Sequence, residues 1–513
     1  MTTRLTRPLP AFALALLGGL AQAASVAFIG NGQPVWWLQV ASLALLAWQV
    51  QAAPGWKQAA LLGWTFAIAW LCGTFWWLFI SMHTYGGLAA PLAGLAVFAL
   101  AAFLGTYYAF ACGVFRAMSP GPGWSPAAFA ALWLLAELLR GRWFTGFPWG
   151  AGGYAHVDGP LAALAPWIGV YGIGLLATVL AQAIAQLAGR LRWTIPAAWI
   201  AGVVVTVVAA SLGHGAAAGA PNGDRISVSL LQGNIPQNEK FEDRTGVPLA
   251  LRWYAEQITR STTRLVVAPE TAIPLLPQQL PEGYFQAMHR RFSTGQQALL
   301  VGIPLGTYEQ GYTNSVIGLK PDGEPYRFDK HHLVPFGEFI PPLFRGFTDL
   351  LHIPLGDFNR GAVGQPSFGW AGQRLAPNIC YEDLFGEELA ARFVDPASAP
   401  TIFVNVSNIG WFGDSVAIDQ HLQISRMRAL EFDRPVIRAT NTGATAIVDL
   451  EAQVTQSLPR YTRDVLTGEV QGRSGTTPFA WWAARLGLWP LWIAGLAPLA
   501  AAALLRSRRR ARP

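Results

Sequence analysis

The sequence predicts a membrane protein made of two parts, a multi-pass α-helical bundle of about eight spans and an α/β domain outside the membrane. Three observations support this fold class. The 513-residue chain is 52% hydrophobic and 13% charged, whereas about 25% of the residues of a soluble protein are charged. Residues 1–212 contain only two acidic residues, Glu137 and Asp158, and the others fall between Asp224 and Glu469. Within that acidic region, β-rich runs alternate with helical runs, as they do in α/β domains.

Eight apolar runs approach the roughly 20 residues that a helix needs to cross a bilayer. They cover about residues 9–28, 34–51, 58–81, 87–115, 125–140, 160–189, 193–212 and 480–505, and the runs at 9–28 and 125–140 are the weakest. The first run also resembles a signal peptide, because Arg4 and Arg7 precede it and Ala21-Gln-Ala23 could be a cleavage site. We favour an uncleaved helix, since a further spanning run follows closely. Both interpretations give the same topology.

Lysine and arginine set the expected orientation, because cytoplasmic connections are rich in them. With the N-terminus inside, the inner connections and tail hold Lys57, Arg116, Arg190, Arg192, Arg506, Arg508, Arg509, Arg510 and Arg512. The expected domains are a transmembrane bundle of about seven helices at 1–212, an outer domain at 213–479, and a final span with a basic cytoplasmic tail at 480–513. In a bacterium, this describes a multi-pass inner-membrane protein with a periplasmic domain.

One outer connection departs from the charge rule. The stretch Arg140-Gly-Arg-Trp-Phe-Thr-Gly-Phe-Pro-Trp149 places two arginines and four aromatic residues beside the membrane. Arg142 and Trp149 are therefore candidates for a lipid headgroup site. Simple anchoring at the membrane interface is the alternative, because both residue types are common there.

The outer domain shows the alternation of an α/β fold. Expected strands cover Ile226–Leu231, Arg264–Ala268, Ala298–Ile303, Asn314–Leu319, Pro400–Val406 and Thr445–Leu450. Expected helices cover Val247–Ile258, Gly283–Phe292, Gly386–Phe393 and His421–Glu431. No phosphate-binding or dinucleotide motif follows a strand, and no cluster has metal-ligand spacing, since the adjacent His331 and His332 would point apart on a strand. The basic residues gather at the chain ends without an interleaved aromatic stripe. We therefore expect no metal, no cofactor and no nucleic-acid partner.

Cys380 is the candidate nucleophile. It is one of three cysteines, and the other two, Cys72 and Cys112, lie in apolar runs, so no disulfide framework is expected. A strand-like run at Phe368–Ile379 leads to it and a helix-like run at Leu384–Phe393 follows, which is how α/β enzymes present a nucleophile near backbone N–H groups. A small buried side chain is the alternative, because most free cysteines are that.

Two further residues complete a catalytic set. Glu270 follows the strand at Arg264–Ala268, where burial could make it a base, although a first-turn helix residue would look the same. Lys330 is one of only four lysines in an arginine-rich chain, which suggests a need for a compact ammonium, with an ordinary surface lysine as the alternative. Activation of a thiol requires a base and a nearby positive charge, and these residues supply both.

The motifs around these residues resemble a known family. Glu270, Lys330 and Cys380 in this order resemble the Glu–Lys–Cys triad of the nitrilase superfamily, whose fold is an αββα sandwich. Six longer stretches resemble bacterial apolipoprotein N-acyltransferases, and the resemblance covers nearly the whole chain. They are Arg142-x-x-Thr-Gly-Phe-Pro-Trp149, Gln232-Gly-Asn-Ile-Pro-Gln237, Lys330-x-His-Leu-Val-Pro-Phe-Gly-Glu-Phe-Ile-Pro341, Ile379-Cys-Tyr-Glu382, Trp411-Phe-Gly-Asp414, and Arg428-Ala-Leu-Glu431 with Arg434-Pro435 and Arg438-Ala-Thr-Asn441.

The resemblance implies a two-step reaction. Cys380 would take an acyl chain from a phospholipid, typically the sn-1 chain of phosphatidylethanolamine, and pass it to the α-amino group of the diacylglyceryl-cysteine of an apolipoprotein. Glu270 would act as general base and acid, and Lys330 with a backbone N–H near Tyr381 would hold the oxyanion. Glu338, Tyr381 and Glu382 match positions that support activity. Phe241 stands where the family usually has Trp, so any hydrogen bond made by that indole is in doubt.

Apolar loops of the outer domain suggest contacts with lipid. Phe339–Ile353 and Ile273–Pro277 are apolar for surface loops and could form a lid that faces the bilayer, with packed core as the alternative. The candidate lipid or substrate contacts are Phe241, Arg142, Trp149, Phe344, Phe347 and Trp411.

Two other functions are alternatives to acyl transfer. A membrane-tethered nitrilase-like amidase would use water as the acceptor, and the triad by itself is compatible with it. A transporter is disfavoured because the spans hold almost no ionisable residues, Glu137 being the exception. The expected partners are a phospholipid donor, a lipoprotein acceptor and membrane lipids, and the protein is expected to act as a monomer.

Overall fold

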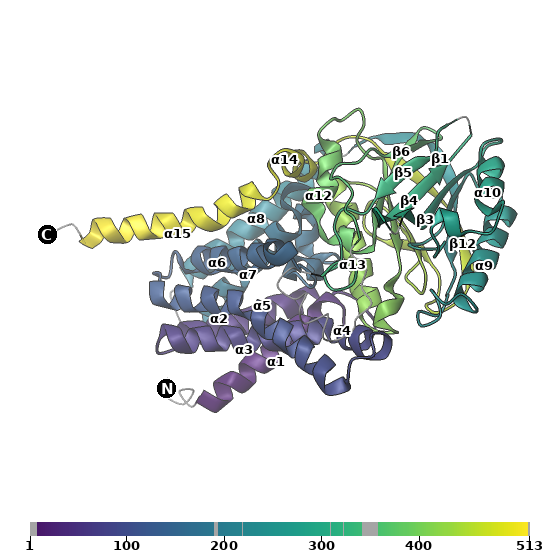
Figure 1. The fold of residues 1–513 in the computed structure, drawn as a ribbon. Helices are drawn as coiled ribbons and strands as arrows, with labels where there is room; N and C mark the ends of the chain where they lie inside the picture. Colours follow the sequence, from purple (N-terminus) through teal and green to yellow (C-terminus); the bar gives the residue numbers. More distant parts are fainter. Residues whose placement is uncertain are drawn as a thin grey trace. The chain divides into compact units, whose positions relative to one another are not determined.

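The computed structural model describes residues 8–188, 193–217, 219–307, 309–321, 323–340 and 358–510 (Figure 1). The chain forms two compact units. The first, called the helical unit, comprises Met1–Phe79, Ala89–Ala216 and Leu486–Pro513. The second, called the sheet unit, comprises Ala217–Arg485 together with Ile80–Leu88. The short segment Ile80–Leu88 lies within the apolar residues 1–212 in the sequence, but it belongs to the sheet unit.

The helical unit consists of long apolar helices. They are α1 (Pro8–Val26), α2 (Trp36–Ala52), α3 (Trp56–Phe75), α5 (Ala90–Met118), α6 (Ser125–Arg142), α7 (Ala165–Ala188), α8 (Thr194–Ala217) and α15 (Trp489–Arg510). Such helices satisfy their backbone polar groups internally, as a bilayer requires. Between α3 and α5 lie a short turn of helix, α4 (Leu78–Ile80), and a π-helical turn, Ser81–Tyr85.

The prediction of about eight spans is supported only in part. Within the described residues, five helices are long and apolar enough to cross a membrane, or six if one bent pair is a single span. All eight predicted runs contain a helix, but α2 has only 17 residues and α6 carries three charged side chains, those of Glu137, Arg140 and Arg142.

The last predicted span is broken. The apolar run at 480–505 divides into α14 (Pro478–Leu486) and α15, which meet at an angle of 88°. Gly487 lies at the break with φ of 55°, a conformation that glycine adopts without strain. Phe479, Ala480 and Ala483 of α14 pack into a hydrophobic cluster of the sheet unit. The correction is therefore that α14 belongs to the sheet unit, and the last helix begins at Trp489.

The sheet unit is a four-layer sandwich built on two six-stranded sheets (Figure 1). One sheet has the order β12-β1-β2-β3-β4-β5 and the other β11-β10-β9-β8-β7-β6. The strands of the first are β1 (Pro221–Gln232), β2 (Leu265–Val267), β3 (Ala298–Thr307), β4 (Gly311–Leu319), β5 (Tyr326–Asp329) and β12 (Asp464–Arg473). Those of the second are β6 (Phe368–Trp370), β7 (Gln373–Ile379), β8 (Ile402–Ser407), β9 (Val436–Thr440), β10 (Ala446–Val448) and β11 (Val454–Ser457).

Side-chain alternation along the strands builds the layers. Leu265 and Val267 of β2 face the core between the sheets, where they meet residues such as Val404 and Val406 of β8. Val266 faces the opposite side and packs in the cluster that includes α9 (Gly246–Arg260) and α10 (Tyr284–Phe292). The outer face of the second sheet packs against α12 (Gly386–Ala390), α13 (Ala417–Phe432) and α14. The architecture is α-β-β-α, as the resemblance to the nitrilase superfamily implies.

Each sheet contains a group of three parallel strands. β1, β2 and β3 are mutually parallel, and so are β7, β8 and β9. The strand-like run at Phe368–Ile379 is a hairpin, because Ala371 and Gly372 form a turn with φ of 51° and 76° between β6 and β7. Parallel strands bring their carboxyl ends to the same edge of each sheet, which is where ligand and catalytic sites of α/β proteins form.

Candidate active site

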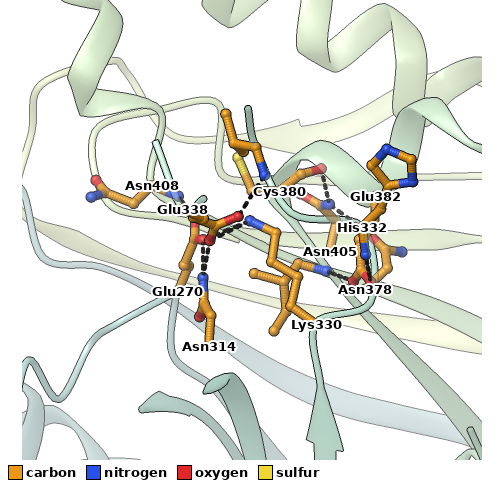
Figure 2. Close-up of polar contacts among 12 residues, drawn as sticks. Glu270, Asn314, Lys330, His332, Glu338, Asn378, Cys380, Glu382, Asn405 and Asn408 are labelled. Atoms are coloured by element: carbon orange, nitrogen blue, oxygen red, sulfur yellow. Dashed lines mark hydrogen bonds and ion pairs between the residues drawn. The ribbon is translucent and has the colours of Figure 1, made fainter. Parts of the chain in front are cut away.

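The three predicted catalytic residues each follow a strand. Glu270 comes shortly after β2, Lys330 directly after β5, and Cys380 directly after β7. Asn408 follows β8 in the same way. Figure 2 shows the side chains of these residues gathered into one cluster, with Cys380 beside the head groups of Glu270, Lys330 and Glu338. The fold thus brings together residues separated by up to 138 positions in the sequence.

Lys330 and Asn314 hold two carboxylates together. The Lys330 Nζ lies 3.3 Å from Glu270 Oε1 and 2.9 Å from Glu338 Oε1. The side-chain amide of Asn314 donates a hydrogen bond of 2.7 Å to each of the same two oxygens. The second oxygen of Glu270 accepts a 2.8 Å hydrogen bond from the backbone N–H of Asn408. These contacts fix the orientation of the Glu270 carboxylate from three directions.

The cluster is shielded from water. Lys330 is fully buried, and Glu270 and Glu338 are 7% and 8% exposed. Burial alone would lower the pKa of Lys330, but the adjacent carboxylates of Glu270 and Glu338 outweigh it and raise that pKa above its usual value. Lys330 is therefore a permanent cation, and in a water-poor site its field acts strongly on any negative charge that develops nearby.

Cys380 occupies a sharp corner of the chain. Its φ is 51°, in the left-handed region that non-glycine residues rarely adopt, and the 3₁₀ turn Cys380–Leu384 begins there. The side chain is half-buried. Burial and the negative charge of Glu270 raise the pKa of the thiol to about 12, while Lys330 and the Ser407 hydroxyl act in the opposite direction. The resting group is thus a neutral thiol, which needs a base at the moment of attack.

A buried polar network holds the backbone at Cys380. His421 Nε2 lies 3.1 Å from the carbonyl oxygen of Cys380, and its Nδ1 lies 2.9 Å from a guanidinium nitrogen of Arg438. Because a guanidinium only donates, Nδ1 is the acceptor and the Nε2–H donates to Cys380. Arg438 also pairs with Asp383 at 3.3 Å, and Ser425 hydrogen-bonds to both Arg438 and Asp383. Burial and the charge of Arg438 lower the pKa of His421 far below its usual value, so this imidazole stays neutral.

Glu382 ties the Cys380 corner to the segment that carries Lys330. Its carboxylate accepts hydrogen bonds of 2.7 Å from the backbone N–H groups of Ile379 and His331, and one of 3.3 Å from His332. Burial raises the pKa of Glu382 to about 7, although these N–H groups oppose the shift. Tyr381, next to it, is buried and packs against the ring of Phe385 at 5.3 Å.

The structure brings in several residues whose role sequence reasoning missed. Asn314, Asn408 and Lys240 contact Glu270 directly, and Gln237 accepts a 2.8 Å hydrogen bond from the Asn408 side chain. Gln237 lies within one of the family motifs. Lys240 is another of the four lysines, and this rarity is the same signal that singles out Lys330. Asn314 and Asn408 carry no comparable signal, because only the paired strands bring them to the carboxylate.

The candidate lipid contacts fall into three groups. Phe241 and Trp411 of the sheet unit are 52% and 39% exposed, and Trp411 packs edge-to-face with Tyr85 at 5.9 Å. Arg142 of the helical unit is exposed. Phe344 and Phe347 lie outside the described residues, as does most of the proposed lid at Phe339–Ile353.

Two expectations about lipid contact need correction. Trp149 is only 2% exposed and packs against Trp77 at 4.8 Å, so its indole is part of the interior of the helical unit. Its carbonyl accepts a 2.8 Å hydrogen bond from Arg140, which is itself buried. The segment Ile273–Pro277 is mainly core rather than lid, because Ile273 and Leu276 are buried in the sheet unit.

The chemistry available at this site is acyl transfer through a thioester. A thiol, a carboxylate that can accept its proton, and a fixed ammonium that can stabilise an oxyanion are the groups that this chemistry needs. Among the described residues, no group of three or more His, Cys, Asp or Glu side chains could hold a metal ion.

Comparisons with known proteins cover both units. A family profile described as Apolipoprotein N-acyltransferase N-terminal domain matches residues 17–183, and one described as Carbon-nitrogen hydrolase matches residues 227–479. The apolipoprotein N-acyltransferase of Verminephrobacter eiseniae is 57% identical to this chain over 92% of both sequences. That of Ralstonia nicotianae is 46% identical over 93% of this chain and 90% of the relative. That of Bordetella bronchiseptica is 42% identical over 97% of this chain and 98% of the relative.

These matches extend over nearly the whole sequence, and the carbon-nitrogen hydrolase match at 227–479 contains Glu270, Lys330 and Cys380. They confirm the resemblance that the sequence motifs indicated, and the chain belongs to the apolipoprotein N-acyltransferase family.

Proposed function

We propose that this chain is an enzyme that transfers an acyl chain from a phospholipid to the N-terminal α-amino group of an apolipoprotein. The donor is the sn-1 chain of phosphatidylethanolamine and the acceptor is the diacylglyceryl-cysteine at the lipoprotein N-terminus. One observation carries the proposal. A half-buried thiol, a buried carboxylate and a buried ammonium converge at Cys380, Glu270 and Lys330 in a chain whose curated relatives are named apolipoprotein N-acyltransferases.

In the first half-reaction, the Cys380 sulfur attacks the ester carbonyl carbon of the donor. Glu270 takes the thiol proton as the S–C bond forms, and the carbonyl oxygen becomes an oxyanion held by Lys330 and a backbone N–H near Tyr381. The ester C–O bond then breaks, and Glu270 returns the proton to the departing lysophospholipid oxygen. An acyl thioester remains on Cys380. The raised thiol pKa, about 12, supports a base-assisted attack rather than a preformed thiolate.

In the second half-reaction, the α-amino group of the acceptor attacks the thioester carbonyl. Glu270 takes a proton from the nitrogen as the N–C bond forms and gives it to the Cys380 sulfur as the C–S bond breaks. The products are an N-acylated lipoprotein and the free thiol. The contacts of Glu270 with Asn314, Lys330 and Asn408 keep its carboxylate oriented through both steps.

The proposed location follows from the lipid nature of both substrates. The helices of residues 1–212 and the last helix anchor the protein in the bacterial inner membrane, the nitrilase-like domain of residues 213–479 acts in the periplasm, and the basic tail lies in the cytoplasm. Two observations support this topology: the five or six helices that are apolar enough to span within the part of the chain that the structure describes, and the distribution of lysine and arginine. We propose that the enzyme works as a monomer and needs no cofactor.

Labelling of an introduced cysteine tests the orientation. Glu282 is exposed in the sheet unit, and a membrane-impermeant maleimide is expected to label Glu282→Cys in intact spheroplasts. Labelling only after the membrane is permeabilised would contradict a periplasmic domain.

The principal alternative is a membrane-tethered amidase that uses water as acceptor. The same three side chains would serve it, because an acyl-enzyme reacts with either water or an amine. The family match over residues 17–183, described by the name of the N-acyltransferase, favours transfer to an amine.

An acyl-transfer assay tests the function. Purified full-length protein is incubated with phosphatidylethanolamine labelled in its sn-1 chain and with a synthetic diacylglyceryl-cysteine peptide. We expect a labelled amide on the peptide, no product from Cys380→Ala, and normal product from the matched control Cys72→Ala, whose thiol lies in the helical unit. Release of labelled fatty acid with no labelled peptide would support the amidase, and product from Cys380→Ala would contradict the mechanism.

A further inference from the structure

Lys240 is a second buried lysine at the reacting groups. It lies in the loop between β1 and α9, at the end of the stretch Gln237–Lys240, and its side chain is 1% exposed. Its Nζ donates a hydrogen bond of 3.1 Å to the backbone carbonyl of Glu270. Its charge interacts with both Glu270 and Cys380. A lysine is almost never fully buried unless it is paired, so this position calls for an explanation.

Lys240 brings a second positive charge to the cluster below about pH 7. Glu270 and Glu338 both bind the Asn314 amide and the Lys330 ammonium through their Oε1 atoms, so two carboxylates lie very close together. Two like charges at that distance repel each other. Lys330 compensates one negative charge. Lys240 is a second cation whose charge acts on Glu270.

We propose that Lys240 is a positioning residue for the general base. It holds the backbone of Glu270 through the carbonyl, and its positive charge near Glu270 and Cys380 stabilises the negative charge that forms as the thiol proton moves. Glu270 takes the thiol proton of Cys380, so Lys240 acts on acyl transfer through Glu270. This inference rests on the proposed acyl-transfer function.

The titration of Lys240 gives the proposal a distinctive pH signature. Burial lowers the pKa of Lys240 to about 7, and the negative charges of Glu270 and Cys380 oppose the shift. The lysine is therefore charged below about pH 7 and loses its charge above it. The charged groups that face this part of the site are Glu270 after β2, Lys330 and Glu338 after β5, and Cys380 after β7. Lys240 should therefore accelerate acyl-enzyme formation most at acidic pH, and this acceleration should decline as the pH rises.

Single-turnover formation of the acyl-enzyme measures this effect. The full-length protein is mixed with phosphatidylethanolamine at a series of pH values, and the acyl adduct on Cys380 is followed by mass spectrometry. We expect Lys240→Met to form the adduct about ten-fold more slowly than wild type near pH 6, and within about two-fold of wild type near pH 9. A purely structural role would slow the reaction by the same factor at every pH.

Two further variants separate the charge from the hydrogen bond. Lys240→Gln keeps a donor without a charge and is expected to show the same pH-dependent loss as Lys240→Met. The matched control is Lys320→Met, because Lys320 also donates to a backbone carbonyl, that of Gly369 at 2.8 Å, but is not part of the catalytic cluster. The control is expected to match wild type at every pH.

The outcomes distinguish this inference from the function on which it rests. Absence of an adduct on wild-type Cys380 would contradict the proposed function itself. A wild-type adduct combined with wild-type rates for Lys240→Met and Lys240→Gln near pH 6 would overturn the role of Lys240 alone. Full recovery by Lys240→Gln would overturn the charge effect, and so would a loss independent of pH in either variant.

Discussion

The imidazole of His421 donates a hydrogen bond of 3.1 Å to the backbone carbonyl of Cys380. Cys380 has a φ of 51°, which costs about 1–2 kcal/mol for a residue with a Cβ atom and persists only when the surroundings enforce it. The neutral ring of His421 is itself fixed by Arg438 at 2.9 Å. The contact therefore fixes the backbone that orients the thiol toward Glu270 and Lys330. Because the imidazole is neutral, it adds no charge at the Cys380 carbonyl.

Removal of the His421 contact should slow acylation while the protein still binds lipid. Because small displacements of a nucleophile are costly, we expect His421→Leu to reduce the rate of acyl-enzyme formation by about 10–100-fold, with KM for phosphatidylethanolamine little changed. His421→Gln retains an N–H donor at similar reach and should recover much of the rate. Equal rates for wild type and His421→Leu would show that the corner does not need this contact.

Asn314 is expected to be as important as the predicted supporting residues. Asn314→Leu removes both 2.7 Å hydrogen bonds and leaves the carboxylates of Glu270 and Glu338 without their shared donor. We expect acylation to fall about 100-fold, because loss of a correctly held base removes a typical general-base contribution. Asn359→Ala, which removes an amide that contacts the carbonyl of Gln310, serves as the control and should leave the rate unchanged. Normal single-turnover rates in Asn314→Leu would contradict the orienting role.

The resting state of Cys380 can be read from its reaction with iodoacetamide. The pKa of the thiol is raised to about 12 by burial and by Glu270, so the thiolate fraction is small at neutral pH and grows as the pH rises. We expect the alkylation rate to increase without a plateau up to about pH 10. Glu270→Gln removes a negative charge that opposes ionisation and should therefore react faster at about pH 9, although its acyl transfer is lost. A plateau of the wild-type rate near neutral pH would indicate a preformed thiolate.

The buried pair of Asp383 and Arg438 should matter for stability as well as for the corner. Both side chains are fully buried and lie 3.3 Å apart. Arg438→Met leaves the Asp383 carboxylate without its partner, and we expect a loss of about 3–5 kcal/mol in the free energy of unfolding. Burial already raises the pKa of Asp383, and loss of Arg438 raises it further. The loss in free energy of unfolding should therefore shrink as the pH falls and the carboxyl group takes up a proton.

Thermal denaturation at several pH values measures this loss. Arg260→Met is the control, because Arg260 pairs with Glu256 on an exposed face of α9, and exposed pairs contribute about 0–1 kcal/mol. A destabilisation by Arg438→Met no larger than that of the control would contradict the importance of the buried pair.

The elements that the sequence predicted well are those with a local signal. The expected strands at Ile226–Leu231 and Ala298–Ile303 lie within β1 and β3, and the expected helix at Val247–Ile258 lies within α9. Each has a periodic or continuous apolar pattern that belongs to the element alone. The strands β5, β9, β11 and β12 were missed. The first three are only four or five residues long, and β12 is largely polar and pairs with the distant strand β1.

The site residues divide in the same way, into those with a local sequence signal and those whose role depends on strand pairing. Glu270, Lys330 and Cys380 were found because each stands out locally, by its position after a strand or by the rarity of its residue type. Asn314 was read only as the start of a strand, and its role depends on the register that pairs β4 with β3 and β5. Trp149 was misjudged for a similar reason, because an aromatic residue beside an arginine looks the same in sequence whether it faces lipid or packs against Trp77.

The central claim is that Cys380 carries the acyl chain between two lipid substrates. Peptide mass spectrometry after incubation with phosphatidylethanolamine tests it most directly. We expect an acyl mass on the peptide that contains Cys380, on no peptide that contains Cys72 or Cys112, and its discharge by a diacylglyceryl-cysteine peptide within the time in which water leaves it intact. An unmodified Cys380 in protein that turns over, or an adduct that water removes as fast as the peptide does, would contradict the account.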